Sequence, residues 1–209
     1  MTELQEYTKI SLVLIIDNLV KETSLKASQL SLFKFVNINK AITMELFSQN
    51  IEEYLYFMVS QYITTHFSTG LKKAITAFSE LLIKLQEGQL LKSSDPCDLK
   101  FSLKEGTHYW LEIKSVNDLN CSTIPRIKEH KDIAEKNGNT YKLFVYDDNE
   151  ILFDEDYRLN GNDFWELTAG FKNAESEIFK IINGAANKLN LSSLIKETHN
   201  RLLNDWRMH

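Results

Sequence analysis

Two acidic residues and one lysine near the middle of the chain have the types and spacing that suit hydrolytic chemistry. Glu112 and Lys114 form an acidic-x-lysine triplet, and Asp98 precedes them in a neighbouring segment. The same spacing occurs twice more, at Asp98/Lys100 and Glu129/Lys131. The triplet at Glu112 differs from the other two because it closes an apolar-backed strand and has a second acid on the strand before it.

These residues are predicted to lie on a β-hairpin. Segments 98–103 and 107–114 alternate apolar and polar residues, as strands with one buried face do. Their apolar residues are Leu99, Phe101, Leu103, Tyr109, Leu111 and Ile113. The residues between the segments would form a three-residue loop that ends on Gly106, where such loops commonly take a positive φ. In that register Asp98 lies directly across from Glu112, and the apolar residues face one another.

Two carboxylates held side by side repel each other unless a positive charge neutralises them. A hard divalent cation does so with oxygen ligands, and Mg²⁺ typically takes one or two carboxylates together with water and a substrate phosphate. Lys114, on the same strand face, would orient the attacking water and offset charge on the phosphate. The arrangement of Asp98, Glu112 and Lys114 therefore predicts a Mg²⁺ site for hydrolysis of phosphodiester bonds.

The segments Ser94–Phe101 and Tyr109–Ser115 together resemble the core motif of the PD-(D/E)xK nuclease superfamily. This resemblance implies a restriction-endonuclease-like core. It also implies that Asp98, Glu112 and the Ile113 carbonyl bind Mg²⁺, and that Lys114 is the catalytic lysine. The motif aspartate is either Asp95 or Asp98, and we favour Asp98 because it lies in the strand and in register.

Further residues follow from this resemblance and from local charge. Glu52 is the candidate accessory acid on a preceding helix, a position at which Glu53 would also suit. Residues 114–142 carry a basic bias in an otherwise acidic chain. The predicted DNA contacts are Lys100, Ser115, Asn117, Asp118, Arg126, Lys128 and Lys131, supplemented by Asn120 and Ser122. The segment 161–170 resembles one found in small type II restriction endonucleases.

The elements that would position these residues form an α/β pattern. Apolar stripes at helical spacing predict helices over residues 12–24, 41–67 and 71–91. After the hairpin come a helical or irregular crossing over 124–137, a strand at 141–146 and a short strand at 151–153. Helices return from residue 162 to 206. We therefore expect a small central mixed β-sheet flanked by helices.

The whole chain, residues 1–209, is predicted to be a single nuclease domain. Its expected parts are a helical part at 1–92, the catalytic hairpin and sheet at 93–160, and C-terminal helices at 161–209. Net charge is −5, which excludes a strongly basic nucleic-acid coat. Cys97 and Cys121 indicate neither a disulfide framework nor a CxxC metal site, and both thiols are expected to be buried or half-buried. The acidic N-terminus and the lack of a long apolar run predict a cytoplasmic protein without a membrane anchor.

Three functions compete at this point. The first is a sequence-specific type II restriction endonuclease that acts on double-stranded DNA as a homodimer. The second is a repair or junction-processing nuclease of the same superfamily. The third is a non-catalytic interaction protein whose charged strand face is incidental.

Overall fold

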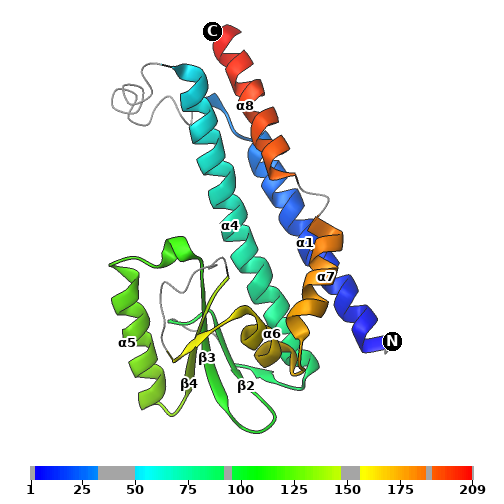
Figure 1. The fold of residues 1–209 in the computed structure, drawn as a ribbon, viewed down its shortest axis with the longest axis vertical. Coiled ribbons are helices and arrows are strands. Elements are labelled where there is room, and N and C mark those ends of the chain that lie inside the picture. Colours follow the sequence, from blue (N-terminus) through cyan, green and yellow to red (C-terminus); the bar gives the residue numbers. More distant parts are fainter. Residues whose placement is uncertain (1–2, 33–49, 92–95, 147–155, 187–189, 209) are drawn as a thin grey trace. The chain divides into compact units, whose positions relative to one another are not determined.

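The computed structural model describes residues 3–32, 50–91, 96–146, 156–186 and 190–208. Its helices are α1 (Glu3–Ser28), α4 (Ile51–Leu85), α5 (Thr123–Lys136), α6 (Gly161–Ala169), α7 (Ala174–Ala186) and α8 (Leu191–Met208), with a short 3₁₀ helix at Val116–Asp118. Its strands are β1 (Gln89–Leu90), β2 (Leu99–Ser102), β3 (His108–Lys114), β4 (Thr140–Val145) and β5 (Arg158–Leu159). The expected mixed α/β class is confirmed (Figure 1).

The chain divides into two compact units, each built from segments distant in the sequence. One combines residues 1–15 with 72–184, and the other combines residues 16–71 with 185–209. The predicted assignment of residues 1–209 to a single nuclease domain stays a prediction. Among the described residues, no helix has both the length and the apolar character needed to cross a bilayer.

The first unit contains a five-stranded mixed sheet in the order β1-β2-β3-β4-β5. The pairs β1/β2 and β2/β3 are antiparallel, whereas β3/β4 and β4/β5 are parallel. Helix α5 provides the crossover between β3 and β4, as a parallel pair requires. Because such a helix runs back along the strands, its first turn lies near the carboxyl end of β3.

Helices cover both faces of this sheet (Figure 1). On one face, Ile127 and Ala134 of α5 join a buried cluster with Tyr141, Leu143 and Val145 of β4. On the other face, Phe144 of β4 stacks on Phe164 of α6, with ring centroids 3.8 Å apart. Phe78 of α4 completes this second layer through Trp165, at 5.8 Å. A strand at the centre of such a sheet is buried on both sides.

The predicted hairpin register is confirmed. The observed partners are Leu99↔Leu111, Lys100↔Trp110, Phe101↔Tyr109 and Ser102↔His108. The loop closes through the Gly106 amide, which donates to the Leu103 carbonyl at 2.9 Å. Gly106 has φ +89°, the left-handed conformation expected at the end of a three-residue loop. One more step of this register places Asp98 across from Glu112.

Several element boundaries differ from the sequence expectation. The two predicted helices that meet near residue 70 form one continuous helix, α4. This helix ends at Leu85 and not at Leu91, because residues 89–90 form β1 on the edge of the sheet. Gly88 makes that turn possible, since a Cβ there would lie 2.9 Å from the Ile83 carbonyl oxygen. Strand β5 was not predicted. The expected strand at 151–153 and the start of the expected helix, at 41–49, lie outside the described residues.

The second unit is helical. Its buried core joins residues from α1, the first half of α4, and α8. The core side chains are Ala27, Leu30, Tyr54, Leu55, Val59, Ile63, Ile195, Leu202 and Leu203. Arg201 of α8 donates hydrogen bonds to the carbonyls of Ala27 and Leu30 at 3.1 and 2.9 Å, which satisfies backbone acceptors at the end of α1.

Candidate active site

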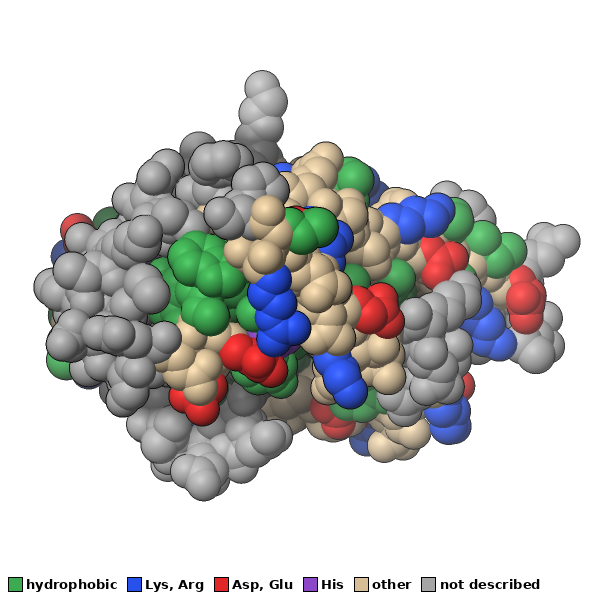
Figure 2. All heavy atoms as spheres, turned by 90° about the horizontal axis from the view of Figure 1, so that it is seen from above, with side chains coloured by type: hydrophobic (Ala, Val, Ile, Leu, Met, Phe, Trp, Pro, Cys, Tyr) green, Lys and Arg blue, Asp and Glu red, His purple; other side chains and the backbone are tan. Residues whose placement is uncertain are grey.

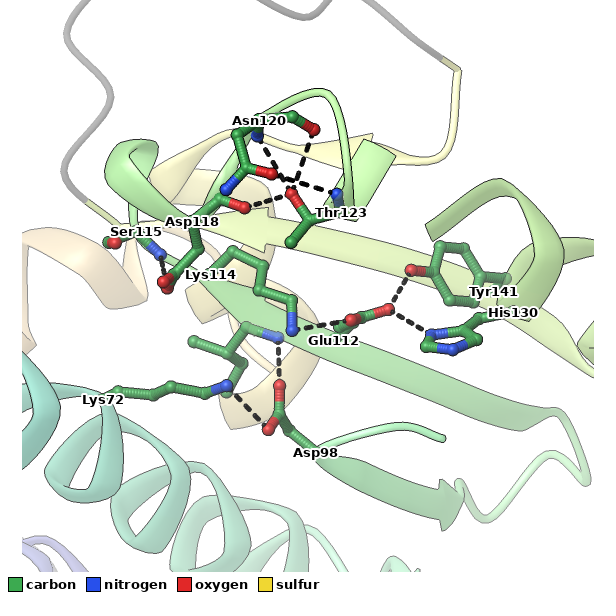
Figure 3. Close-up of polar contacts among 11 residues, drawn as sticks. Lys72, Asp98, Glu112, Lys114, Ser115, Asp118, Asn120, Thr123, His130 and Tyr141 are labelled. Atoms are coloured by element: carbon green, nitrogen blue, oxygen red, sulfur yellow. Dashed lines mark hydrogen bonds and ion pairs between the residues drawn. The ribbon is translucent and has the colours of Figure 1, made fainter. Parts of the chain in front are cut away.

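Asp98 lies directly before β2 and is tied to two other elements. Its Oδ2 accepts a hydrogen bond from the Ile113 amide of β3 at 2.7 Å. Its Oδ1 forms an ion pair with the Lys72 ammonium of α4 at 2.9 Å. Both side chains are about three-quarters buried, at 24% and 28% exposure. Asp98 is therefore fixed beside the main chain of the predicted motif strand (Figure 3).

Glu112 is almost completely buried, at 2% exposure, and its two oxygens have different partners. Oε1 lies 2.8 Å from the Lys114 ammonium. Oε2 accepts a hydrogen bond from the Tyr141 hydroxyl at 2.6 Å and lies 3.1 Å from His130 Nδ1. Since a carboxylate only accepts, the ring nitrogen is the donor in that contact. The structure thus brings Asp98, Glu112 and Lys114 together, as the sequence predicted (Figure 3).

The protonation states of this cluster follow from burial and these contacts. Burial alone would raise the pKa of Glu112, but hydrogen bonds from Lys114, Tyr141 and His130 outweigh it and hold the pKa below its ordinary value. Burial would likewise lower the pKa of Lys114, yet Glu112 and Asp98 raise it. Burial and the charge of Glu112 both raise the pKa of Tyr141. At neutral pH Glu112 is therefore an anion, Lys114 a cation and Tyr141 a hydrogen-bond donor.

The oxygen atoms at this site are of the type that binds Mg²⁺. Carboxylate oxygens of Asp98 and Glu112 at neighbouring positions across two strands, with the Ile113 carbonyl between the motif residues, are the hard ligands this ion prefers. Nowhere in the described ranges do three or more His, Cys, Asp or Glu side chains gather as a metal-binding group. All four carboxylate oxygens also have protein partners, two of which are the ammonium groups of Lys72 and Lys114. A divalent ion would consequently compete with these two lysines for the same oxygens.

The predicted phosphate contacts on α5 differ in their surroundings. Arg126 and Lys128 are exposed. Lys131 lies 3.0 Å from the Glu135 carboxylate and 5.6 Å from the centre of the Tyr157 ring. Arg126 is one helical turn before His130, and so it lies on the side of α5 that faces Glu112.

Two of the remaining predicted DNA contacts, Lys100 and Ser115, are buried. Lys100 is 7% exposed, and its ammonium lies 3.9 Å from the centre of the Trp110 ring. A phosphate contact would require this side chain to leave that ring. Ser115 is buried, and its amide donates to the Asp118 carboxylate at 3.1 Å. Asn120 Oδ1 accepts from the Ser122 hydroxyl at 2.6 Å. The side chain of Asn117 lies outside the described part of the chain.

Surface charge on the face drawn in Figure 2 is mixed. The described Lys and Arg side chains there alternate with Asp and Glu and form no continuous basic patch. This agrees with the net charge of −5.

Two predicted acids have no contact with the cluster to report: Glu52 belongs to the other unit, and Asp95 is not among the described residues. Glu52 belongs to the second unit, where its carboxylate lies 3.6 Å from Arg207 of α8. The contacts of Asp98 and Glu112 do not include it. Asp95 lies outside the described residues, so the choice between Asp95 and Asp98 rests on the contacts that Asp98 makes.

Three residues of the cluster were not assigned a role from the sequence: Lys72, His130 and Tyr141. Each comes from a different element, namely α4, α5 and β4. His130 lies within the basic segment 114–142 and falls on the same helix side as the apolar Ile127 and Ala134. A polar residue at the edge of an otherwise apolar helix stripe is the pattern that would have indicated a buried partner.

The two cysteines have contrasting environments. Cys97 is buried next to Asp98, and burial together with the charge of Glu112 raises the pKa of its thiol to about 12. Cys121 is exposed in the loop between β3 and α5, contrary to the expectation that it would be at least half-buried. Neither forms a disulfide in the structure.

Comparison of the sequence with families of known proteins and with curated proteins finds no match. The geometry of the Asp98–Glu112–Lys114 cluster is therefore the feature from which a function can be inferred.

Proposed function

We propose that this chain is a Mg²⁺-dependent DNA endonuclease of the PD-(D/E)xK type, which hydrolyses phosphodiester bonds in double-stranded DNA. The observation that carries the proposal is the buried Glu112 carboxylate with Lys114 on the same strand and Asp98 directly before the neighbouring strand, where its Oδ2 accepts from the Ile113 amide. A carboxylate that is 2% exposed is not part of a solvated strand face. This burial distinguishes the triplet from the two others with the same spacing.

The residues of the candidate site would have three roles: metal binding, stabilisation of charge and phosphate binding. Asp98, Glu112 and the Ile113 carbonyl would hold the metal ion. When bound, Mg²⁺ supplies Lewis-acid stabilisation for the charge that develops on the phosphate. Lys114 has a raised pKa, so it would act as a cation that stabilises this charge and orients water, and not as the base. Arg126 and Lys128 would contact the phosphates on either side.

Within this class we favour a sequence-specific type II restriction endonuclease that acts as a homodimer. Two copies related by a twofold axis would place one site on each strand of a palindromic sequence. Support comes from the resemblance of residues 161–170 to small enzymes of that kind. That segment forms α6, whose Phe164 packs against the sheet. A repair or junction-processing nuclease is the second outcome that the following experiment distinguishes.

The test is cleavage of plasmid and phage DNA by the purified chain with Mg²⁺ or with EDTA. Glu112→Ala should abolish cleavage. Glu129→Gln is the matched control, since Glu129 has the same spacing to a lysine but is exposed on α5. Discrete fragments would support a restriction enzyme, and cutting only at branched or damaged DNA would support a repair enzyme. No Mg²⁺-dependent cleavage of any DNA by the folded wild type would refute both.

A further inference from the structure

The two oxygens of Glu112 face different surroundings. Oε2 is held by Tyr141, a side chain at 2% exposure, and by His130 at 12%. Oε1 faces Lys114, which at 22% exposure is the most accessible of the three partners. Oε2 therefore lies on the closed side of the carboxylate, and Oε1 lies on the open side.

The two partners of Oε2 come from elements that the sheet itself aligns. Tyr141 is in β4, where it pairs with Trp110, two residues before Glu112 on the same face of β3. His130 is in α5, which packs on that face through Ile127 and Ala134. Two donors from different elements fix both the position and the rotation of the carboxylate plane, because each approaches the same oxygen from its own element.

We propose that Tyr141 and His130 are positioning residues that turn the Glu112 carboxylate so that only Oε1 is offered to a metal ion. This inference rests on the proposed function, since it assigns Glu112 as a metal ligand. Glu112 would then bind the ion through one oxygen. A freely rotating carboxylate would be able to use both, and would spend less time in the productive orientation.

The test compares Tyr141→Phe and His130→Leu with the wild type, and adds two controls. Tyr157→Phe removes a buried hydroxyl from the ring that packs against Tyr141, with centroids 5.5 Å apart, but leaves the contacts of Glu112 with Lys114, Tyr141 and His130 intact. His130→Asn keeps a donor near the position of Nδ1. Binding of Mn²⁺ is measured by titration calorimetry and electron paramagnetic resonance without DNA, and thermal unfolding identifies variants that fold.

Loss of a hydrogen bond to a metal ligand typically weakens metal affinity by about 10- to 100-fold. We expect Tyr141→Phe and His130→Leu to fall in this range, with His130→Asn and Tyr157→Phe closer to wild type. In cleavage assays, higher Mg²⁺ should restore turnover of Tyr141→Phe without changing the KM for DNA. A purely structural role would not produce this metal-dependent rescue.

The outcomes separate the inference from the proposed function. Equal Mn²⁺ affinity for Tyr141→Phe, Tyr157→Phe and the wild type would overturn the positioning role, even if the wild type cleaves DNA. Weakened Mn²⁺ binding by Tyr141→Phe in a protein that cleaves no DNA would support the positioning role and refute the nuclease. A wild type that binds no Mn²⁺ at all would overturn the inference.

Discussion

Replacement of Lys72 by methionine should tighten metal binding, although the change removes an ion pair. The Lys72 ammonium lies 2.9 Å from Asp98 Oδ1, the oxygen for which a divalent ion would compete. At an effective dielectric constant of about 20, the Coulomb attraction at this distance is about 6 kcal/mol before desolvation and side-chain entropy are subtracted. For a pair about a quarter exposed, a net coupling of about 1–2 kcal/mol remains.

A competing ion must overcome this net coupling, and each 1.4 kcal/mol corresponds to about a tenfold change in affinity. We therefore expect Lys72→Met to bind Mn²⁺ about tenfold more tightly than the wild type in titration calorimetry without DNA. Lys73→Met is the matched control, because Lys73 is the next residue of α4 and is exposed. If Lys72→Met binds Mn²⁺ no more tightly than Lys73→Met, the competition between lysine and metal is refuted.

Three further predictions concern acid stability, packing and DNA binding. The pKa of Glu112 is lowered in the folded chain, so its contribution to stability is present above the ordinary pKa of 4.5 and is lost as the pH falls through the folded value. The melting temperature of the wild type should thus fall more steeply in acid than that of Glu112→Gln. Gly88→Ala should lower the free energy of unfolding in urea by about 2 kcal/mol, because its Cβ would meet the Ile83 and Ser102 carbonyls at 2.9 and 3.2 Å. For DNA binding in EDTA, the logarithm of the binding constant should fall less steeply with the logarithm of the salt concentration in Arg126→Ala. The slope should be smaller in magnitude by about 1, which is the effect of losing one phosphate contact.

Each of these predictions has an outcome that contradicts it. If the melting temperatures of the wild type and of Glu112→Gln fall by the same amount between pH 7 and pH 3, the Glu112 contacts do not depend on its charge. An unchanged urea midpoint for Gly88→Ala would contradict the close approach at the turn before β1. For DNA binding, Arg207→Ala is the control, since Arg207 is an exposed arginine of the second unit. An equal change of slope in both variants would argue against a specific role for Arg126.

The β2–β3 hairpin was predictable because its information is local. Apolar alternation on both strands and a three-residue loop ending in Gly106 admit one register, and a slip of one residue would separate Leu99 from Leu111 across the sheet. The placement of Asp98 beside the motif strand follows from that register. The candidate site residues on the hairpin could therefore be placed side by side without knowledge of the rest of the fold.

The residues that surround the site were not predictable in this way. Lys72, His130 and Tyr141 reach it through packing of α4, α5 and β4, and no local periodicity encodes those contacts. The short strand β1 was assigned to a helix because two residues are too few to show alternation, and its conformation depends on pairing with β2. Tertiary pairing overrides local preference most easily in such short elements.

The contrast between the two cysteines makes the chain suited to selective labelling. Burial raises the pKa of the Cys97 thiol to about 12, so the thiol is protonated at pH 7, and the same burial blocks access of reagents. Cys121 is exposed in the loop that follows the motif strand. A maleimide fluorophore or spin label would therefore attach at Cys121 without any substitution, and its signal would test whether metal or DNA binds at the candidate site.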